Sequence, residues 1–141
     1  MLYKSYSPEE TEKIATELAK EIEPGTVLCL DGELGVGKTA MTKAICKALG
    51  VTENVYSPTY TIINRYDGKF PIYHIDAYRI EDVDEMYEIG FDDCLAEGVC
   101  IIEWSSVISD ILPQQRIEIQ ISRDINIDEN YREITVNSTI N

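Results

Sequence analysis

Positive charge and histidine are scarce in this sequence. Its 141 residues include 12 lysines and arginines against 26 aspartates and glutamates, and the formal net charge is −14. A chain this acidic repels the phosphate backbone of nucleic acids, so we expect a partner protein to make any contact with nucleic acid. An anion that binds to the chain itself must be held by a local arrangement of donors.

Long apolar runs and paired cysteine motifs are also missing. No apolar run approaches the roughly 20 residues that a membrane helix needs. The N-terminal MLYKSYSPEE lacks the apolar core of a signal peptide. We therefore expect a cytoplasmic protein without a membrane partner. The four cysteines form no C-x-x-C pair, and with a single histidine they argue against a zinc site and for reduced, buried thiols.

Residues 32–39, GELGVGKT, fit the pattern G-x-x-x-x-G-K-[ST] of a loop that cradles phosphate groups. The apolar segment 26–30 predicts a buried strand that enters this loop, and residues 38–49 predict a helix that leaves it. Glycines allow backbone N–H groups to turn toward phosphate oxygens, a lysine reaches the terminal phosphates, and a threonine hydroxyl ligates Mg²⁺. The residues predicted to bind the nucleotide here are Gly32, Glu33, Gly35, Val36, Gly37, Lys38, Thr39 and Ala40.

The remaining pattern mixes helices with alternating strands. Ser7 and Glu10 form a capping box that starts a helix, which we expect to end at Pro24-Gly25. Other predicted elements are a hairpin of 60–66 and 72–76, a helix at 81–89, a buried strand at 99–102, and a second hairpin of 116–122 and 131–137. The chain length favours one domain over residues 1–141.

Two acidic residues end predicted strands. Glu103 follows the apolar strand 99–102, and Asp76 ends the strand that begins at residue 72. In nucleotide hydrolases, acids in such places hold Mg²⁺ or orient the attacking water. We predict that both are catalytic, with Lys38, and that both hold the metal, with Thr39. The nearby His74, Arg79 and Trp104 have open roles, structural or functional.

Ser57-Pro58-Thr59 follows the predicted helix of the phosphate loop. Thr59 lies where switch loops place a threonine that senses the γ-phosphate and the metal. A simple proline turn accounts equally well for the same three residues.

The ordered motifs GELGVGKT, SPTY, HIDAYR and IIEW together resemble the TsaE (YjeE) family of small bacterial P-loop ATPases. The resemblance is strong over about residues 5–105 and weaker in the tail. It implies an α/β fold of the P-loop NTPase kind: a mixed sheet with parallel core strands, antiparallel hairpins and flanking helices. The whole chain would then be a single P-loop ATPase domain.

The resemblance also implies a function and further site residues. The ligands would be ATP or ADP with Mg²⁺, and the partners would be the TsaD and TsaB proteins, which form threonylcarbamoyladenosine at position 37 of tRNA. Hydrolysis would reset the partner complex between turnovers, and tRNA would be met only through the partners. Thr11 matches a residue near the base, and Arg132 matches an arginine near the nucleotide.

Other functions share part of this pattern. A small P-loop kinase would need an arginine-rich lid, but the five arginines are dispersed. A GTPase would need D-x-x-G after the loop and N-K-x-D, and neither occurs. A nucleotide-sensing interaction module without functional hydrolysis would carry the same loop, so it remains an alternative.

Overall fold

One mixed sheet organises residues 1–33, 35–58 and 62–139, which the computed structural model describes. The strand order across the sheet is β1-β7-β6-β2-β5-β4-β3. Strands β6, β2, β5 and β4 pair in parallel, whereas β1–β7, β7–β6 and β4–β3 pair antiparallel. The strands are β1 (Leu2–Ser5), β2 (Val27–Gly32), β3 (Ile63–Asp67), β4 (Pro71–Asp76), β5 (Val99–Glu103), β6 (Ile117–Arg123) and β7 (Arg132–Ser138). The predicted α/β fold with parallel core strands and antiparallel hairpins is confirmed.

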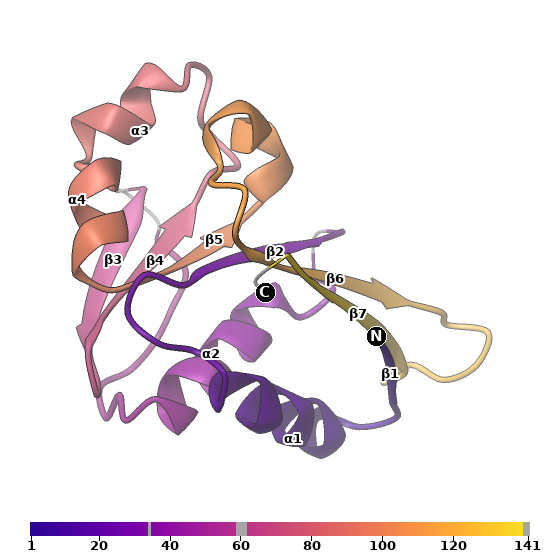
Figure 1. The fold of residues 1–141 in the computed structure, drawn as a ribbon. Coiled ribbons are helices and arrows are strands. Elements are labelled where there is room, and N and C mark those ends of the chain that lie inside the picture. Colours follow the sequence, from indigo (N-terminus) through magenta and orange to yellow (C-terminus); the bar gives the residue numbers. More distant parts are fainter. Residues whose placement is uncertain (34, 59–61, 140–141) are drawn as a thin grey trace.

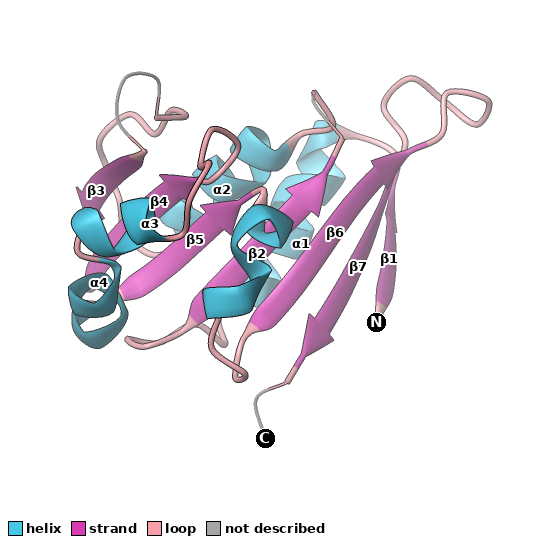
Figure 2. Ribbon diagram, turned by 90° about the horizontal axis from the view of Figure 1, so that it is seen from above, coloured by secondary structure: helices cyan, strands magenta, loops and turns pink. Residues whose placement is uncertain are grey.

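Helices cover both faces of this sheet (Figures 1 and 2). Helices α1 and α2 lie against one face, and α3, α4 and the 3₁₀ helix η1 lie on the other. Their bounds are α1 (Pro8–Ala19), α2 (Lys38–Ala48), α3 (Asp84–Glu88), α4 (Phe91–Glu97) and η1 (Ser105–Ile111). Within the described ranges, no helix is long and apolar enough to cross a membrane.

The sheet separates two apolar cores because side chains alternate along β2. Leu28 and Leu30 pack with Met41 in the core under α1 and α2. Cys29 packs with Ile75 and Phe91 in the core under α3 and α4. A central strand that is buried on both faces explains the continuous apolar run in the sequence.

Helix α1 starts as its capping signal predicts. The Ser7 hydroxyl accepts a hydrogen bond from the Glu10 N–H (3.1 Å), and the Glu10 carboxylate accepts one from the Tyr6 N–H (2.8 Å). The predicted end at Pro24-Gly25 is wrong, because the helix ends at Ala19. The backbone N–H groups of residues 20–22 each donate to the carbonyl three residues back, which tightens the chain into turns.

Both predicted hairpins are present, as β3–β4 and β6–β7. Residues 60 and 61 of the first predicted strand lie outside the described residues. The helix predicted at 81–89 is present only as α3. The prediction omitted β1, α4 and η1, which are short and depend on tertiary contacts; β1, for example, is an edge strand that pairs with β7.

The four cysteines lie in the two apolar cores, which confirms that they are buried. All four are buried free thiols. Burial raises the pKa of Cys29 to about 11 and the pKa values of Cys46 and Cys100 to about 12. These thiols therefore stay protonated, and weakly nucleophilic, near neutral pH.

Candidate functional site

The GELGVGKT segment lies where β2 ends and α2 begins, as predicted. Strand β2 is an interior strand that pairs in parallel with β5 and β6. The N-cap of α2 is Gly37, whose φ of +114° is in the left-handed region that favours glycine. Glycine has no side chain to bond the N–H groups of the first helical turn. Those groups and the positive end of the helix dipole can therefore receive an anion.

Gly32 brings the start of the loop close to β6. A Cβ atom at this position would lie 2.5 Å from the carbonyl oxygen of Ile121 and 2.9 Å from a methyl carbon of Val36. The first approach could be relieved only by movement of the β6 backbone, and the second only by movement of the Val36 side chain. The glycine in the first position of the motif is therefore required by packing as well as by its backbone conformation.

Lys38 is folded back onto its own loop. Its side chain is buried, with the residue 5% exposed. Nζ donates to the carbonyl oxygens of Gly32 (2.6 Å) and Glu33 (2.8 Å) and lies 4.2 Å from the centroid of the Trp104 ring. The ammonium group is thus held by backbone dipoles and an aromatic face, contacts that phosphate oxygens could replace.

Burial lowers the pKa of Lys38 from its ordinary value of 10.5. The carboxylates of Glu103, Asp31 and Asp76 act in the opposite direction, because negative charge favours the ammonium form. Asp31 was not among the predicted site residues. Its position at the end of β2, directly before the first glycine of the motif, is the signal that could have pointed to it.

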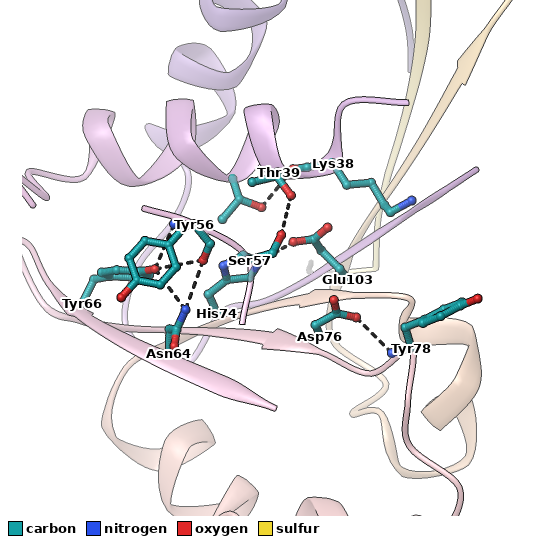
Figure 3. Close-up of polar contacts among 11 residues, drawn as sticks. Lys38, Thr39, Tyr56, Ser57, Asn64, Tyr66, His74, Asp76, Tyr78 and Glu103 are labelled. Carbon is teal, nitrogen blue, oxygen red and sulfur yellow. Dashed lines mark hydrogen bonds and ion pairs between the residues drawn. The ribbon is translucent and has the colours of Figure 1, made fainter. Parts of the chain in front are cut away.

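The two predicted catalytic acids are brought together by strand register. Parallel pairing of β4 with β5 sets Asp76 opposite Glu103. Glu103 is 3% exposed and contacts the imidazole Nε2 of His74. Asp76 is half-buried and accepts a hydrogen bond from the Tyr78 N–H (3.0 Å). Figure 3 shows Glu103 below the start of α2, near Lys38 and Thr39, and Asp76 farther below, beside Tyr78.

Thr39 connects the phosphate loop with the segment that follows α2. Its hydroxyl lies 2.7 Å from the hydroxyl of Ser57 (Figure 3). Ser57 and Pro58 are half-buried, but the predicted switch residue Thr59 lies outside the described residues.

The side-chain oxygens at this end of the sheet are of the kind that Mg²⁺ prefers. They are the Thr39 hydroxyl and the carboxylates of Asp76 and Glu103, and Mg²⁺ prefers such hard oxygen donors. No cluster of three or more histidine, cysteine or acidic side chains capable of holding a metal occurs in the part of the chain that the structure describes. Mg²⁺ in nucleotide sites keeps several waters and takes phosphate oxygens as ligands, so this smaller donor set fits it.

A pocket of about 350 Å³ adjoins the other side of the loop. It brings together predicted residues from distant parts of the sequence: Thr11 from α1, Val36, Gly37 and Ala40 from the loop and α2, and Arg132 from β7. Lys43 and Asn130 also line it and were not predicted.

Arg132 and Thr11 shape this pocket through hydrogen bonds. The Arg132 Nε donates to the carbonyl oxygen of Val36 (2.8 Å), which fixes the loop against β7. The Thr11 hydroxyl lies 2.7 Å from that of Ser5. Glu33 is exposed and lines a different cavity, with Asp31 and Trp104.

The family model described as threonylcarbamoyl adenosine biosynthesis protein TsaE matches residues 5–134. The chain belongs to the TsaE family. Membership connects it with the biosynthesis of threonylcarbamoyladenosine in tRNA.

Individual TsaE relatives match over most of their length. The tRNA threonylcarbamoyladenosine biosynthesis protein TsaE of Bacillus subtilis is 45% identical over 135 residues, which cover 94% of this chain and 82% of that protein. The protein of the same name from Treponema pallidum is 35% identical over 133 residues, with 94% and 96% covered. The crystal structure of Bacillus subtilis YdiB superposes with a TM-score of 0.79 at 40% identity, covering 98% of this chain and 84% of that one.

Proposed function

We propose that this chain is a single P-loop ATPase domain that binds ATP with Mg²⁺ and hydrolyses it to ADP. We further propose that hydrolysis supports repeated turnover of the TsaB–TsaD complex in threonylcarbamoylation of tRNA adenosine 37. The observation that carries the proposal is that three segments meet at the carboxyl ends of the parallel strands. The phosphate loop after β2, Asp76 on β4 and Glu103 on β5 all lie around Lys38.

Each part of the site has a role in nucleotide binding. The pocket between Thr11 and Arg132 receives the base and ribose. The N–H groups at the start of α2 hold the phosphates. Lys38 exchanges its two carbonyl partners for phosphate oxygens, which keeps its ammonium group hydrogen-bonded throughout. Thr39, Asp76 and Glu103 would hold Mg²⁺, which, when bound, neutralises charge on the phosphate oxygens.

The carboxylates also act on water. Glu103 and Asp76 each have acceptor oxygens that can hold a water by hydrogen bonds and orient it for attack on the γ-phosphate. Lys38 stabilises the negative charge that is spread over the phosphoryl oxygens in the transition state.

The net charge of −14 supports indirect action on tRNA. Close approach of this chain to a phosphate backbone is opposed by charge repulsion, so the partners hold the RNA. Phosphate binding at Lys38 then depends on local donors alone.

The test measures phosphate release from MgATP by the protein alone and with purified TsaB–TsaD. We expect slow release alone and a clear rise with the partners. Lys38→Ala should lose ATP binding, whereas Glu103→Ala should bind ATP and release little phosphate. Lys13→Ala, at an exposed position of α1, is the matched lysine control. Binding without phosphate release under either condition would favour a nucleotide-sensing module and overturn the catalytic roles of both acids.

A further inference from the structure

His74 is buried in the middle of β4, on the same sheet face as the proposed acids. It is 0% exposed. Parallel pairing sets His74 opposite Ile101 and Asp76 opposite Glu103, so residues 74 and 76 of β4 and 101 and 103 of β5 point to one face. This is the face on which α2 carries Lys38 and Thr39 (Figure 3).

The contact between His74 and Glu103 defines which nitrogen carries the proton. His74 Nε2 is hydrogen-bonded to Glu103 Oε2. An ionised carboxylate only accepts hydrogen bonds, so Nε2 must donate. Nδ1 is buried and has no hydrogen-bond partner among the described residues. A doubly protonated ring would bury an N–H group without an acceptor, so the geometry favours the neutral ring with its proton on Nε2.

Placing a histidine at this buried strand position has an energetic cost. A buried polar atom without a hydrogen-bond partner is energetically unfavourable, and an apolar side chain of similar size would avoid that cost. The imidazole supplies one hydrogen-bond donor that points at the Glu103 carboxylate. It engages one oxygen of Glu103 and leaves the second oxygen and the full negative charge available.

We propose that His74 is a positioning residue that fixes the Glu103 carboxylate, as a neutral Nε2–H donor, so that its remaining oxygen serves the metal and water side of the site. The proposal rests on the proposed ATPase function for its consequence, but the pairing itself can be measured without turnover. In this proposal His74 acts through Glu103 and not directly on the nucleotide or the metal.

The first experiment is ¹⁵N NMR of the free protein with labelled histidine. His74 is the only histidine in the chain, so its two ring nitrogens are the only imidazole signals. We expect the pattern of a neutral ring with the proton on Nε2. Glu103→Gln should move the Nε2 signals, because a charged acceptor becomes neutral. A proton on Nδ1, or signals that Glu103→Gln leaves unchanged, would overturn the proposal whatever the ATPase activity.

The second experiment compares two amide variants of His74. Glutamine places its side-chain N–H₂ near the position of Nε2, whereas asparagine places it near Nδ1 and is too short. We expect His74→Asn to lower kcat by roughly 10- to 100-fold with ATP affinity unchanged, and His74→Gln to restore most of kcat. Equal loss in both variants, or an equal loss of ATP affinity, would overturn the proposal.

The two experiments separate the possible failures. If the wild-type protein releases no phosphate with its partners, the proposed function fails, and the NMR signals still decide whether His74 orients Glu103. Thermal denaturation shows whether each amide variant of His74 folds. If one does not, the NMR spectra of the wild type and of Glu103→Gln decide whether His74 donates to Glu103.

Discussion

The Lys38 ammonium group lies 4.2 Å from the centroid of the Trp104 ring. Trp104 has a left-handed backbone conformation, with φ of 58°, and its ring packs on Tyr78 at a centroid distance of 4.9 Å. A residue other than glycine held at positive φ stores strain that the surrounding structure must support, and such residues gather at functional sites. The ring covers the lysine that, in the proposed function, exchanges its two carbonyl partners for phosphate oxygens.

The first prediction uses Trp104 as a reporter. It is the only tryptophan, so its emission reports on one place in the molecule. ATP binding should move Lys38 away from the two loop carbonyls and change the surroundings of the ring, giving a saturable change in fluorescence. Lys38→Met should remove the change, and Lys13→Met should leave it intact. Nucleotide binding that is detected by calorimetry without any change in emission would contradict this prediction.

The second prediction concerns the uptake of protons when ATP binds. The pKa of Lys38 is lowered from 10.5 in the free protein by burial. A bound phosphate favours the ammonium form and raises that pKa again. ATP binding should therefore be accompanied by proton uptake at Lys38 in the pH range between the lowered pKa and 10.5. Calorimetry in buffers of different ionisation enthalpy measures the uptake. ATP binding without proton uptake at any alkaline pH below 10.5 would count against it.

The third prediction tests the hydrogen bond from Arg132 to the Val36 carbonyl. Replacing Arg132 by methionine keeps most of the apolar stem but removes the donor that holds the loop to β7. We expect ATP affinity to fall roughly tenfold, since a hydrogen bond from a charged group is worth about 1.5–3 kcal/mol. Arg123→Met is the control, because Arg123 is exposed and pairs with Arg132 across the same hairpin. A loss of ATP affinity of similar size in both variants would refute a specific role for the hydrogen bond from Arg132 to Val36.

The fourth prediction separates clash from backbone strain in the loop. Gly32→Ala places a Cβ atom 2.5 Å from the Ile121 carbonyl oxygen, whereas Gly37→Ala meets no atom of the described residues within 4 Å and is strained by its φ. We expect Gly32→Ala to lower the free energy of unfolding by about 3 kcal/mol and Gly37→Ala by about 1–2 kcal/mol. Urea denaturation measures both values. Equal destabilisation would mean that β6 moves away at little cost.

Local sequence determined the elements around the phosphate loop. An apolar run, a glycine-rich turn and a helix that follows it are consecutive, so short-range sterics and burial specify them without knowledge of the rest. The capping residues Ser7 and Glu10 predicted the start of α1 for the same reason. The end of α1 was misplaced, because the apolar spacing continues through Ile22 after the backbone has left the helix.

Only the tertiary structure decided which residues meet. Asp76 and Glu103 were predicted as separate strand ends, and parallel register made them neighbours. The same register joined His74 to Glu103, a pairing for which the sequence offered no local signal, since 29 positions separate the two residues. Thr11 and Arg132 reached one pocket because the fold brings α1 and β7, which are far apart in the sequence, next to the same loop. Local pattern specifies an element through the period of its side chains, whereas strand order and register depend on contacts made across the whole chain.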